Sequence, residues 1–211
     1  MLRKSLTCVA AAAVTGVLAF APAAPAQSGG VSGGGSATTA ADPTFYNVPF
    51  GYRDLRRGMN GADVKTLNWA LRGLALGTIP HHSFDWTTHG AVRSLQASSG
   101  LSASGVVNSY TRNAIAARMR SQQASWYGPG FWGNRTACGK KLRKRTIGVA
   151  HKKLPCGSRV VFAYGGRWVR AKVIDRGPYV KGRKWDLTRA LAKKLGTIPV
   201  GTAVVKASVA R

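Results

Sequence analysis

The spacing of apolar residues changes near residue 122, and this change constrains the fold more than any other feature. In the preceding region apolar residues recur every three or four positions, as on one face of a helix: Val64, Leu67, Leu71 and Leu74. In the following region apolar and charged residues alternate, as in a strand with one face in water: Val169, Arg170, Ala171, Lys172 and Val173. We therefore expect a small helical domain at residues 50–121 and a mostly-β domain at residues 122–211.

The first 26 residues have the pattern of a secretory signal peptide. Arg3 and Lys4 precede an apolar stretch at residues 8–20, and Ala24-Pro25-Ala26 supplies small residues for cleavage. Residues 27–49 are rich in glycine, serine and threonine, which predicts a flexible linker. Because no cysteine stands at the cleavage site, we expect an exported protein with no membrane anchor, located outside the cell or in the cell wall.

The helical region shows a weak internal repeat. Residues 64–68 and 92–96 match in character position by position, which indicates a bundle built from two similar halves. A helix is expected to start near residues 60–63, and another to follow Asn108. Core packing is the expected role of Trp69 and Trp86, with a platform for sugar rings as the alternative. Histidines near a turn most commonly lie at the surface, so no metal site is expected at the three histidines of this region: His81, His82 and His89.

The β region contains a strong hairpin signal. Two strand-like runs, 159–164 and 167–174, flank Gly165-Gly166. A short helix is expected to follow Asp186, whose side chain would cap it, and a last strand is expected at residues 203–207. Several short strands with one helix in about 90 residues predict a small barrel.

The net charge favours an anionic partner. The chain has 32 Lys and Arg against 6 Asp and Glu, a formal charge of +26. Since the signal peptide removes the protein from nucleic acid and no nucleic-acid-binding motif is present, we expect anionic cell-wall polymers to be the partner. The alternative, that the charge only keeps the surface solvated, remains open.

Few residues in the β region can carry acid–base chemistry. The chain has no glutamate, and Asp175, Asp186 and His151 are the titratable candidates from residue 124 onward. A carboxylate that caps a helix is held in its charged form and is a poor proton donor. Asp186 is therefore expected to be structural, which leaves Asp175 as the candidate acid.

Two cysteines remain once the signal peptide, with Cys8, is removed. In an oxidising compartment Cys138 and Cys156 are expected to form a disulfide. The bond would close a loop of about 19 residues, which the chain-entropy model values at roughly 3 kcal/mol. Two thiols and one nearby histidine fall short of the four ligands of a structural zinc site, so neither a metal nor another cofactor is expected.

The helical region resembles the three-helix peptidoglycan-binding family. The resemblance covers some 65 residues and rests on the segments 55–67 and 88–111, with Gly61-Ala62-Asp63-Val64 in the first and Gly90-Ala91-Val92-Arg93-Ser94-Leu95-Gln96 in the second. The sequence departs from the family at three positions: Asn68, Leu95 and Ser104.

The β region resembles the rare lipoprotein A (RlpA) family. The motifs are Ala124-Ser125-Trp126-Tyr127-Gly128, Thr136-Ala137-Cys138-Gly139, Val149-Ala150-His151, and Asp175-Arg176-Gly177-Pro178-Tyr179 with Asp186-Leu187-Thr188. The resemblance implies a double-psi β-barrel and, for its members, lytic transglycosylase activity on the cell wall. It also implies functional roles for His151 and Asp175, whereas the family's glutamate is replaced here by Lys140.

Two functions follow as expectations. In the first, the protein is a lytic transglycosylase that cleaves MurNAc–GlcNAc bonds in peptidoglycan glycan strands to 1,6-anhydro products, because one carboxyl group can both donate and accept the proton. Asp175 would be this group and His151 would orient it or the sugar. The groove would be lined by the substrate-binding residues Tyr127, Tyr179, Arg176 and Lys140. In the second, the protein is a non-catalytic, expansin-like protein that binds or loosens the wall.

Overall fold

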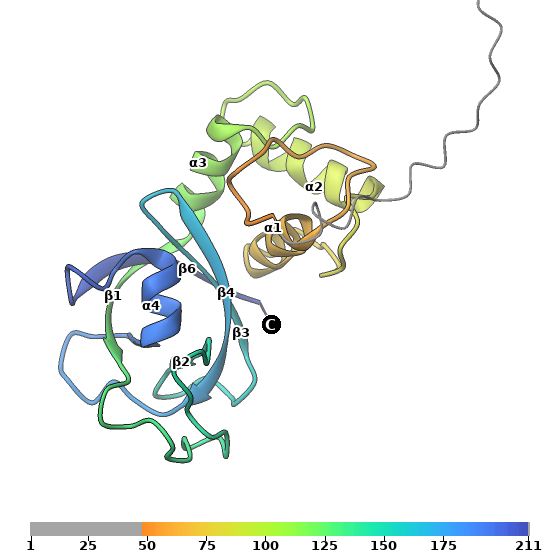
Figure 1. The fold of residues 1–211 in the computed structure, drawn as a ribbon. Helices are drawn as coiled ribbons and strands as arrows, with labels where there is room; N and C mark the ends of the chain where they lie inside the picture. Colours follow the sequence, from red (N-terminus) through yellow and green to blue (C-terminus); the bar gives the residue numbers. More distant parts are fainter. Residues whose placement is uncertain (1–47, 211) are drawn as a thin grey trace, which may run out of the picture. The chain divides into compact units, whose positions relative to one another are not determined.

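The computed structural model describes residues 48–210 and contains a three-helix region followed by a closed barrel, as the sequence predicts (Figure 1). The expected signal peptide and nearly all of the expected linker lie outside the described residues. The helices are α1 (Ala62–Gly73), α2 (Trp86–Ala97) and α3 (Ser109–Arg118). The barrel elements are β1 (Arg120–Tyr127), β2 (Val149–Ala150), β3 (Arg159–Tyr164), β4 (Arg167–Asp175), β5 (Trp185–Thr188), α4 (Arg189–Leu195) and β6 (Ala203–Ala210). Within residues 48–210, no helix combines the length and the apolar character that crossing a membrane requires.

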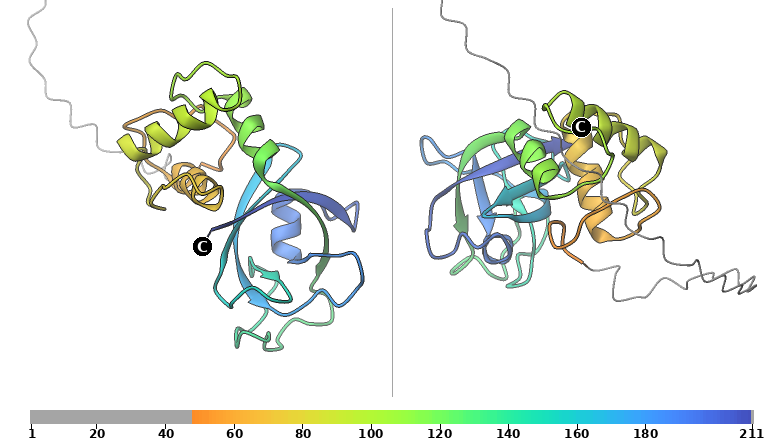
Figure 2. Two further views of the ribbon diagram at one scale, coloured as in Figure 1. Left: turned by 180° about the vertical axis from the view of Figure 1, so that it is seen from behind. Right: turned by 90° about the horizontal axis from the view of Figure 1, so that it is seen from above.

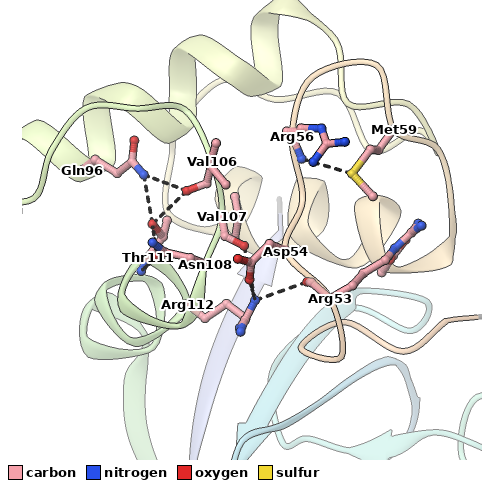
Figure 3. A network of polar contacts seen from close by, with 11 residues as sticks. Arg53, Asp54, Arg56, Met59, Gln96, Val106, Val107, Asn108, Thr111 and Arg112 are labelled. Carbon is pink, nitrogen blue, oxygen red and sulfur yellow. Dashed lines mark hydrogen bonds and ion pairs between the residues drawn. The ribbon is translucent and has the colours of Figure 1, made fainter. Parts of the chain in front are cut away.

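The internal repeat of the sequence is visible in the hydrogen bonding of the helical region. Asn68 on α1 accepts a hydrogen bond from the hydroxyl of Thr88, in the first turn of α2. Gln96 occupies the equivalent position on α2 and donates to the hydroxyl of Thr111, in the first turn of α3 (Figure 3). Both amides also bond to backbone groups of the loop that follows their helix. Each half of the repeat therefore uses one buried amide to fix a loop and the start of the next helix.

A second polar network joins the segment before α1 to α3 (Figure 3). Arg112 on α3 donates to the carboxylate of Asp54 at 3.1 Å and to the backbone oxygens of Arg53 and Val107. The side chain of Arg53 pairs with the buried carboxylate of Asp63 at 2.6 Å. These charge-assisted bonds hold the extended segment across the bundle, where it has few backbone partners of its own.

Six strands close the barrel in the order β1-β5-β2-β4-β3-β6. The hairpin β3–β4 has the predicted register, with Tyr164 opposite Arg167 across the Gly165-Gly166 turn. The pairs β1–β5 and β2–β4 are parallel, so residues far apart in the sequence meet at the same level of the barrel. The large side chains of Phe162 and Trp185 are fully buried in the barrel core and pack edge to face with ring centroids 5.2 Å apart, the common geometry of buried aromatic pairs.

One hydrophobic core is shared between the helical region and the outer face of the β3–β4 hairpin, while the interior of the barrel forms a second core. Phe50, ahead of α1, packs edge to face on Trp168 of β4 with ring centroids 5.0 Å apart. Val161 and Ala163 of β3 belong to the same buried cluster as the helices. Ser208 of β6 donates a hydrogen bond to a backbone oxygen of α1. The described residues therefore fall within one compact unit by their contacts, although their sequence patterns differ. Figure 2 shows the closed barrel from behind and from above.

Two expectations from the sequence are wrong. Asp186 does not cap α4, because β5 continues past it to Thr188, whose hydroxyl accepts the capping hydrogen bond from Leu191. Trp86 is not a core residue, since its side chain is 67% exposed. It is the first residue of α2 and lies under the guanidinium of Arg57, 3.7 Å from the ring centroid. In contrast, Trp69 is partly buried and packs against the shared core, as expected.

Candidate active site

The two carboxylates of the barrel lie on either side of one small residue. Ala150 of β2 pairs with Asp175 of β4 on one side and with Asp186 of β5 on the other. Residues in register on neighbouring strands project to the same face of a sheet. Strands in a sheet are roughly 4.8 Å apart, so the backbones of β4 and β5 are about 10 Å apart. The alanine methyl group leaves the space between the two carboxyl groups open.

Asp175 is held in place by three hydrogen-bond donors. Its Oδ1 accepts from the backbone N–H of Ala137 and of Arg176, both at 2.9 Å. Its Oδ2 accepts from the phenolic hydroxyl of Tyr127 at 3.2 Å. Burial and the negative charge of Asp175 raise the pKa of Tyr127 far above its ordinary value, so the phenol keeps its proton and remains a donor. These bonds fix the direction of the Asp175 carboxylate.

Asp186 is in a less polar setting. Only the hydroxyl of Ser125 donates a hydrogen bond to it within the described residues, at 2.9 Å. Burial raises the pKa of Asp186, against the opposing effects of this hydrogen bond and of Arg183, and the charge of Asp175 raises it further. The barrel thus contains one carboxylate with three donors and one carboxyl group that retains its proton more readily, the arrangement that separates a base from an acid.

Neither of these carboxyl groups forms an ion pair with another described residue. The salt bridges found within residues 48–210 all lie in the helical region. The barrel nevertheless carries most of the chain's lysines and arginines, so unpaired carboxylates at its surface are unexpected on composition alone. A strand-end position with unpaired titratable groups is typical of a functional site.

A cavity of about 270 Å³ joins the two carboxyl groups to an aromatic rim. Tyr127 and Phe131 lie edge to face within it, with ring centroids 6.2 Å apart. The side chain of Tyr179 is 82% exposed at its edge. Aromatic rings with one free face suit the apolar faces of sugar rings. The cavity is lined by Tyr127, Phe131, Asn134, Arg135, Thr136, Leu142, Ala150, Asp175, Arg176, Tyr179 and Asp186.

His151 lies next to Asp175 in the backbone but its side chain does not face the cavity. Its ring is buried against Trp185, and its Nδ1 accepts hydrogen bonds from the backbone N–H groups of Lys153 and Leu154. Burial and the nearby positive charges of Lys184 and Arg176 lower the pKa of His151, so the ring is neutral and its Nδ1 is an acceptor. No hydrogen bond joins this ring to the Asp175 carboxylate in the described part of the chain.

The two basic residues expected at the site have different positions. Arg176 lines the cavity, but its guanidinium turns to the backbone oxygens of His151 and Leu154. The His151 ring therefore binds the backbone of the 152–154 turn, and the carbonyl oxygens of His151 and Leu154 bind the Arg176 side chain of the cavity lining. Lys140 is exposed and does not line the cavity. It ends a turn in which the Thr136 N–H donates to the Lys140 carbonyl oxygen and the Lys140 N–H donates to the Thr136 hydroxyl.

The predicted disulfide holds this turn against the barrel. Cys138 and Cys156 are bonded, with their Cα atoms 5.7 Å apart. The backbone N–H groups of Cys138 and Gly157 donate to Ile174 and Val173 of β4. Because Ala137 precedes Cys138, the crosslink fixes one of the three donors to Asp175.

Sequence reasoning missed Asp186, Ser125 and Phe131. The alternation of buried Trp185 and Leu187 around Asp186 is a strand signal, and it was outweighed by the helix-cap interpretation. Phe131 lies in a loop with no periodic pattern. Residues 48–210 contain no group of three or more His, Cys, Asp or Glu side chains placed to bind a metal ion.

The barrel region and the helical region each match a protein-family model. Residues 119–207 match the family model described as lytic transglycolase, and residues 60–115 match the model of the peptidoglycan binding domain.

Several curated relatives match part of the chain. The "Probable endolytic peptidoglycan transglycosylase RlpA" of Aquifex aeolicus is 47% identical over 90 residues, which are 42% of this chain and 40% of the relative. The endolytic peptidoglycan transglycosylase RlpA of Neisseria meningitidis serogroup A is 37% identical over 131 residues, or 59% of this chain and 55% of the relative. The matched segment thus spans about half or less of these relatives. Among solved structures, the Streptomyces papain inhibitor is 24% identical and covers 44% of this chain and 94% of its own, with a TM-score of 0.37. The chain thus contains a segment that matches the lytic transglycolase family model and folds as a closed six-stranded barrel, preceded by a segment that matches the peptidoglycan binding domain model.

Proposed function

We propose that this protein is a secreted lytic transglycosylase that cleaves the glycan strands of peptidoglycan, with Asp186 as the proton donor and Asp175 as the base. The observation that carries the proposal is the pair of carboxyl groups on either side of Ala150, in one cavity and without ion-pair partners. The relatives named as endolytic peptidoglycan transglycosylases support the substrate class.

The two carboxyl groups suffice for the proposed chemistry. Asp186 gives its proton to the glycosidic oxygen, the bond from that oxygen to the anomeric carbon breaks, and the departing sugar leaves as an alcohol. The 6-hydroxyl of the remaining sugar bonds to the anomeric carbon and gives its proton to Asp175, which closes a 1,6-anhydro ring. Proton exchange with solvent then restores both groups. The raised pKa of Asp186 and the three donors on Asp175 favour this assignment over the reverse one.

The surrounding residues have supporting roles in this proposal. Tyr127 holds Asp175, while Tyr179 and Phe131 offer ring faces to neighbouring sugars along the groove. His151 is a positioning residue, because its neutral ring orders the turn whose carbonyl groups bind Arg176. Each of these residues serves binding or orientation, so none has to exchange a proton with the substrate.

The helical region would bring the barrel to its substrate. Its match to the peptidoglycan-binding family supports recognition of the same glycan. We propose that the predicted signal peptide delivers the protein to the cell wall and that its cationic surface binds anionic wall polymers there. The net charge of +26 supports this partner class.

A second candidate function rests on Lys140. Lys140 replaces the glutamate of the resembled family, and the chain has no glutamate elsewhere. If glycan cleavage requires the family's glutamate, the barrel binds the wall without cleaving it.

Digestion of purified peptidoglycan separates the two functions. Mass analysis of the soluble products should reveal 1,6-anhydro ends with the wild type, and these should be absent with Asp175→Asn and with Asp186→Asn. The control is Asp54→Asn, which removes an exposed carboxylate of the helical region and should leave cleavage unchanged. Binding of all four proteins to insoluble wall without any anhydro product would establish the binder instead.

Substitution at residue 140 tests the second candidate directly. Lys140→Glu restores the family's carboxyl group, and Lys140→Gln removes the positive charge alone. Higher anhydro yield from Lys140→Glu than from Lys140→Gln would show that the missing group limits a working site. Equal, non-zero yields would show that Asp175 and Asp186 suffice.

A further inference from the structure

Three positive side chains are gathered on the outer face of the β3–β4 hairpin, away from the candidate active site. Arg159 pairs directly with Lys172, and Arg170 pairs with Val161 two positions further along the same ladder. In a hairpin, paired positions two apart project to the same face. Val161 and its neighbours on this face pack against the helical region, so Arg159, Arg170 and Lys172 lie at the end of an interface.

In the part of the chain that the structure describes, these cations have no acidic partners. No salt bridge within residues 48–210 involves Arg159, Arg170 or Lys172. Like charges directly opposite one another on a ladder are destabilising, and Arg159 faces Lys172 in this way. Arg170 is partly buried, and this burial together with the charge of Arg159 lowers its pKa. The protein tolerates repulsion here that a single acidic residue would relieve.

The cations border a cavity of about 650 Å³ rather than a flat surface. Its opposite wall includes Trp69 of α1, and the Arg159 guanidinium lies 4.9 Å from the centroid of that ring. This contact holds Arg159 in one direction, which reduces the entropy lost when it binds a ligand. Arg167 of β4 and Lys194 of α4 add two more positive groups to the lining.

We propose that this cavity, between the β3–β4 face and α1, is a binding site for the phosphate groups of a phosphodiester polymer. Guanidinium groups bind phosphate through two parallel hydrogen bonds, and an ammonium group adds a point charge. Positions two apart on a strand are about 7 Å apart. Successive phosphates of one chain can therefore contact successive cations, whereas an isolated carboxylate would neutralise only one of them.

The site is distinct from the cavity that contains Asp175 and Asp186, since the two cavities have no lining residue in common. Phosphate binding would hold the protein on a phosphate-bearing wall while the other cavity meets the glycan. The inference deepens the proposed attachment to anionic wall polymers, but it does not depend on glycan cleavage.

Fluorescence anisotropy with labelled linear polyphosphate tests the site. The variant Arg159→Gln/Arg170→Gln/Lys172→Gln is compared with Arg143→Gln/Arg145→Gln/Lys152→Gln, which loses the same charge from exposed loops outside this cavity. We expect the first variant to bind at least about tenfold more weakly than wild type, as loss of charge-assisted bonds predicts. Its slope of log affinity against log salt should fall by about 2, at roughly 0.7 per lost phosphate contact. The second variant should stay within about threefold of wild type.

Melting curves keep the test independent of folding. Without polyphosphate, the first variant should melt at or above the wild-type temperature because repulsion is removed. Polyphosphate should raise the melting temperature of the wild type but not of that variant. Equal losses of polyphosphate affinity in the two triple variants would overturn the proposal. It would also be overturned if polyglutamate bound the wild type as tightly as polyphosphate does and lost the same affinity in the first variant. Asp175→Asn should bind polyphosphate like the wild type, so failure of the cleavage mechanism and failure of this site are distinguishable.

Discussion

The disulfide between Cys138 and Cys156 should contribute a measurable part of the stability of the whole described unit. The bond closes a loop across a sequence separation of 18 residues. The chain-entropy model values such a loop at about 3 kcal/mol. Neither cysteine is buried, so Cys138→Ser/Cys156→Ser should remove the crosslink without leaving a cavity. At about 2–4 °C for each kcal/mol in a unit of this size, the melting temperature should fall by about 6–12 °C.

Scanning calorimetry of the exported protein measures this change. The wild type treated with a reductant should melt with the double variant, and the reductant should not affect the variant. Glycan cleavage should also decline at temperatures where the variant is fully folded, because Ala137 next to Cys138 donates to Asp175. A decrease of less than about 3 °C, with free thiols absent from the wild type, would refute the loop-closure reasoning.

Three further predictions concern the titratable groups of the barrel. Burial raises the pKa of Asp186, so ionising this carboxyl group lowers the stability of the folded protein at pH values above its unfolded-state pKa of about 3.9. In urea unfolding, Asp186→Asn should therefore be more stable than the wild type at pH 7 and equally stable near pH 3. Equal stability at both pH values would contradict the assigned burial effect. Because the pKa of His151 is lowered, the folded protein should lose stability as the pH falls below about 6.5. His151→Asn keeps a hydrogen-bond acceptor and should lose less stability over the same pH range. Identical stability–pH profiles of the wild type and His151→Asn would contradict this prediction. Tyr127→Phe removes one of three hydrogen bonds to Asp175, so it should cost about 1 kcal/mol of stability and slow glycan cleavage, whereas the exposed Tyr52→Phe should change neither; unchanged cleavage in Tyr127→Phe would remove this tyrosine from the site.

Most elements of the fold could be predicted because their signals are local. The Gly165-Gly166 turn and the alternation around it specify a hairpin wherever the hairpin packs, and β3 and β4 have that register. Asn108 ends an extended segment and caps α3 as expected, because the capping bond reaches only to Thr111. The disulfide bond was predictable because two cysteines remain after the expected signal peptide and the expected compartment is oxidising.

The candidate site could be predicted only in part because its members meet through distant pairings. Asp186 stands next to a helix in the sequence, and nothing local distinguishes a cap from the end of a strand. Only the pairing of β5 with β1 and β2 places its side chain beside Ser125 and opposite Ala150. In the same way, the direction of the His151 ring depends on its packing against Trp185.

The sequence by itself determined the order of the two regions, the hairpin, the disulfide and the scarcity of carboxyl groups. The tertiary structure alone decided that Asp186 lies in one cavity with Asp175. It also decided that three cations of the β3–β4 hairpin share one outer face. The physical reason is that period and turn chemistry act over a few residues, whereas burial, desolvation and charge proximity depend on which strands become neighbours when the barrel closes.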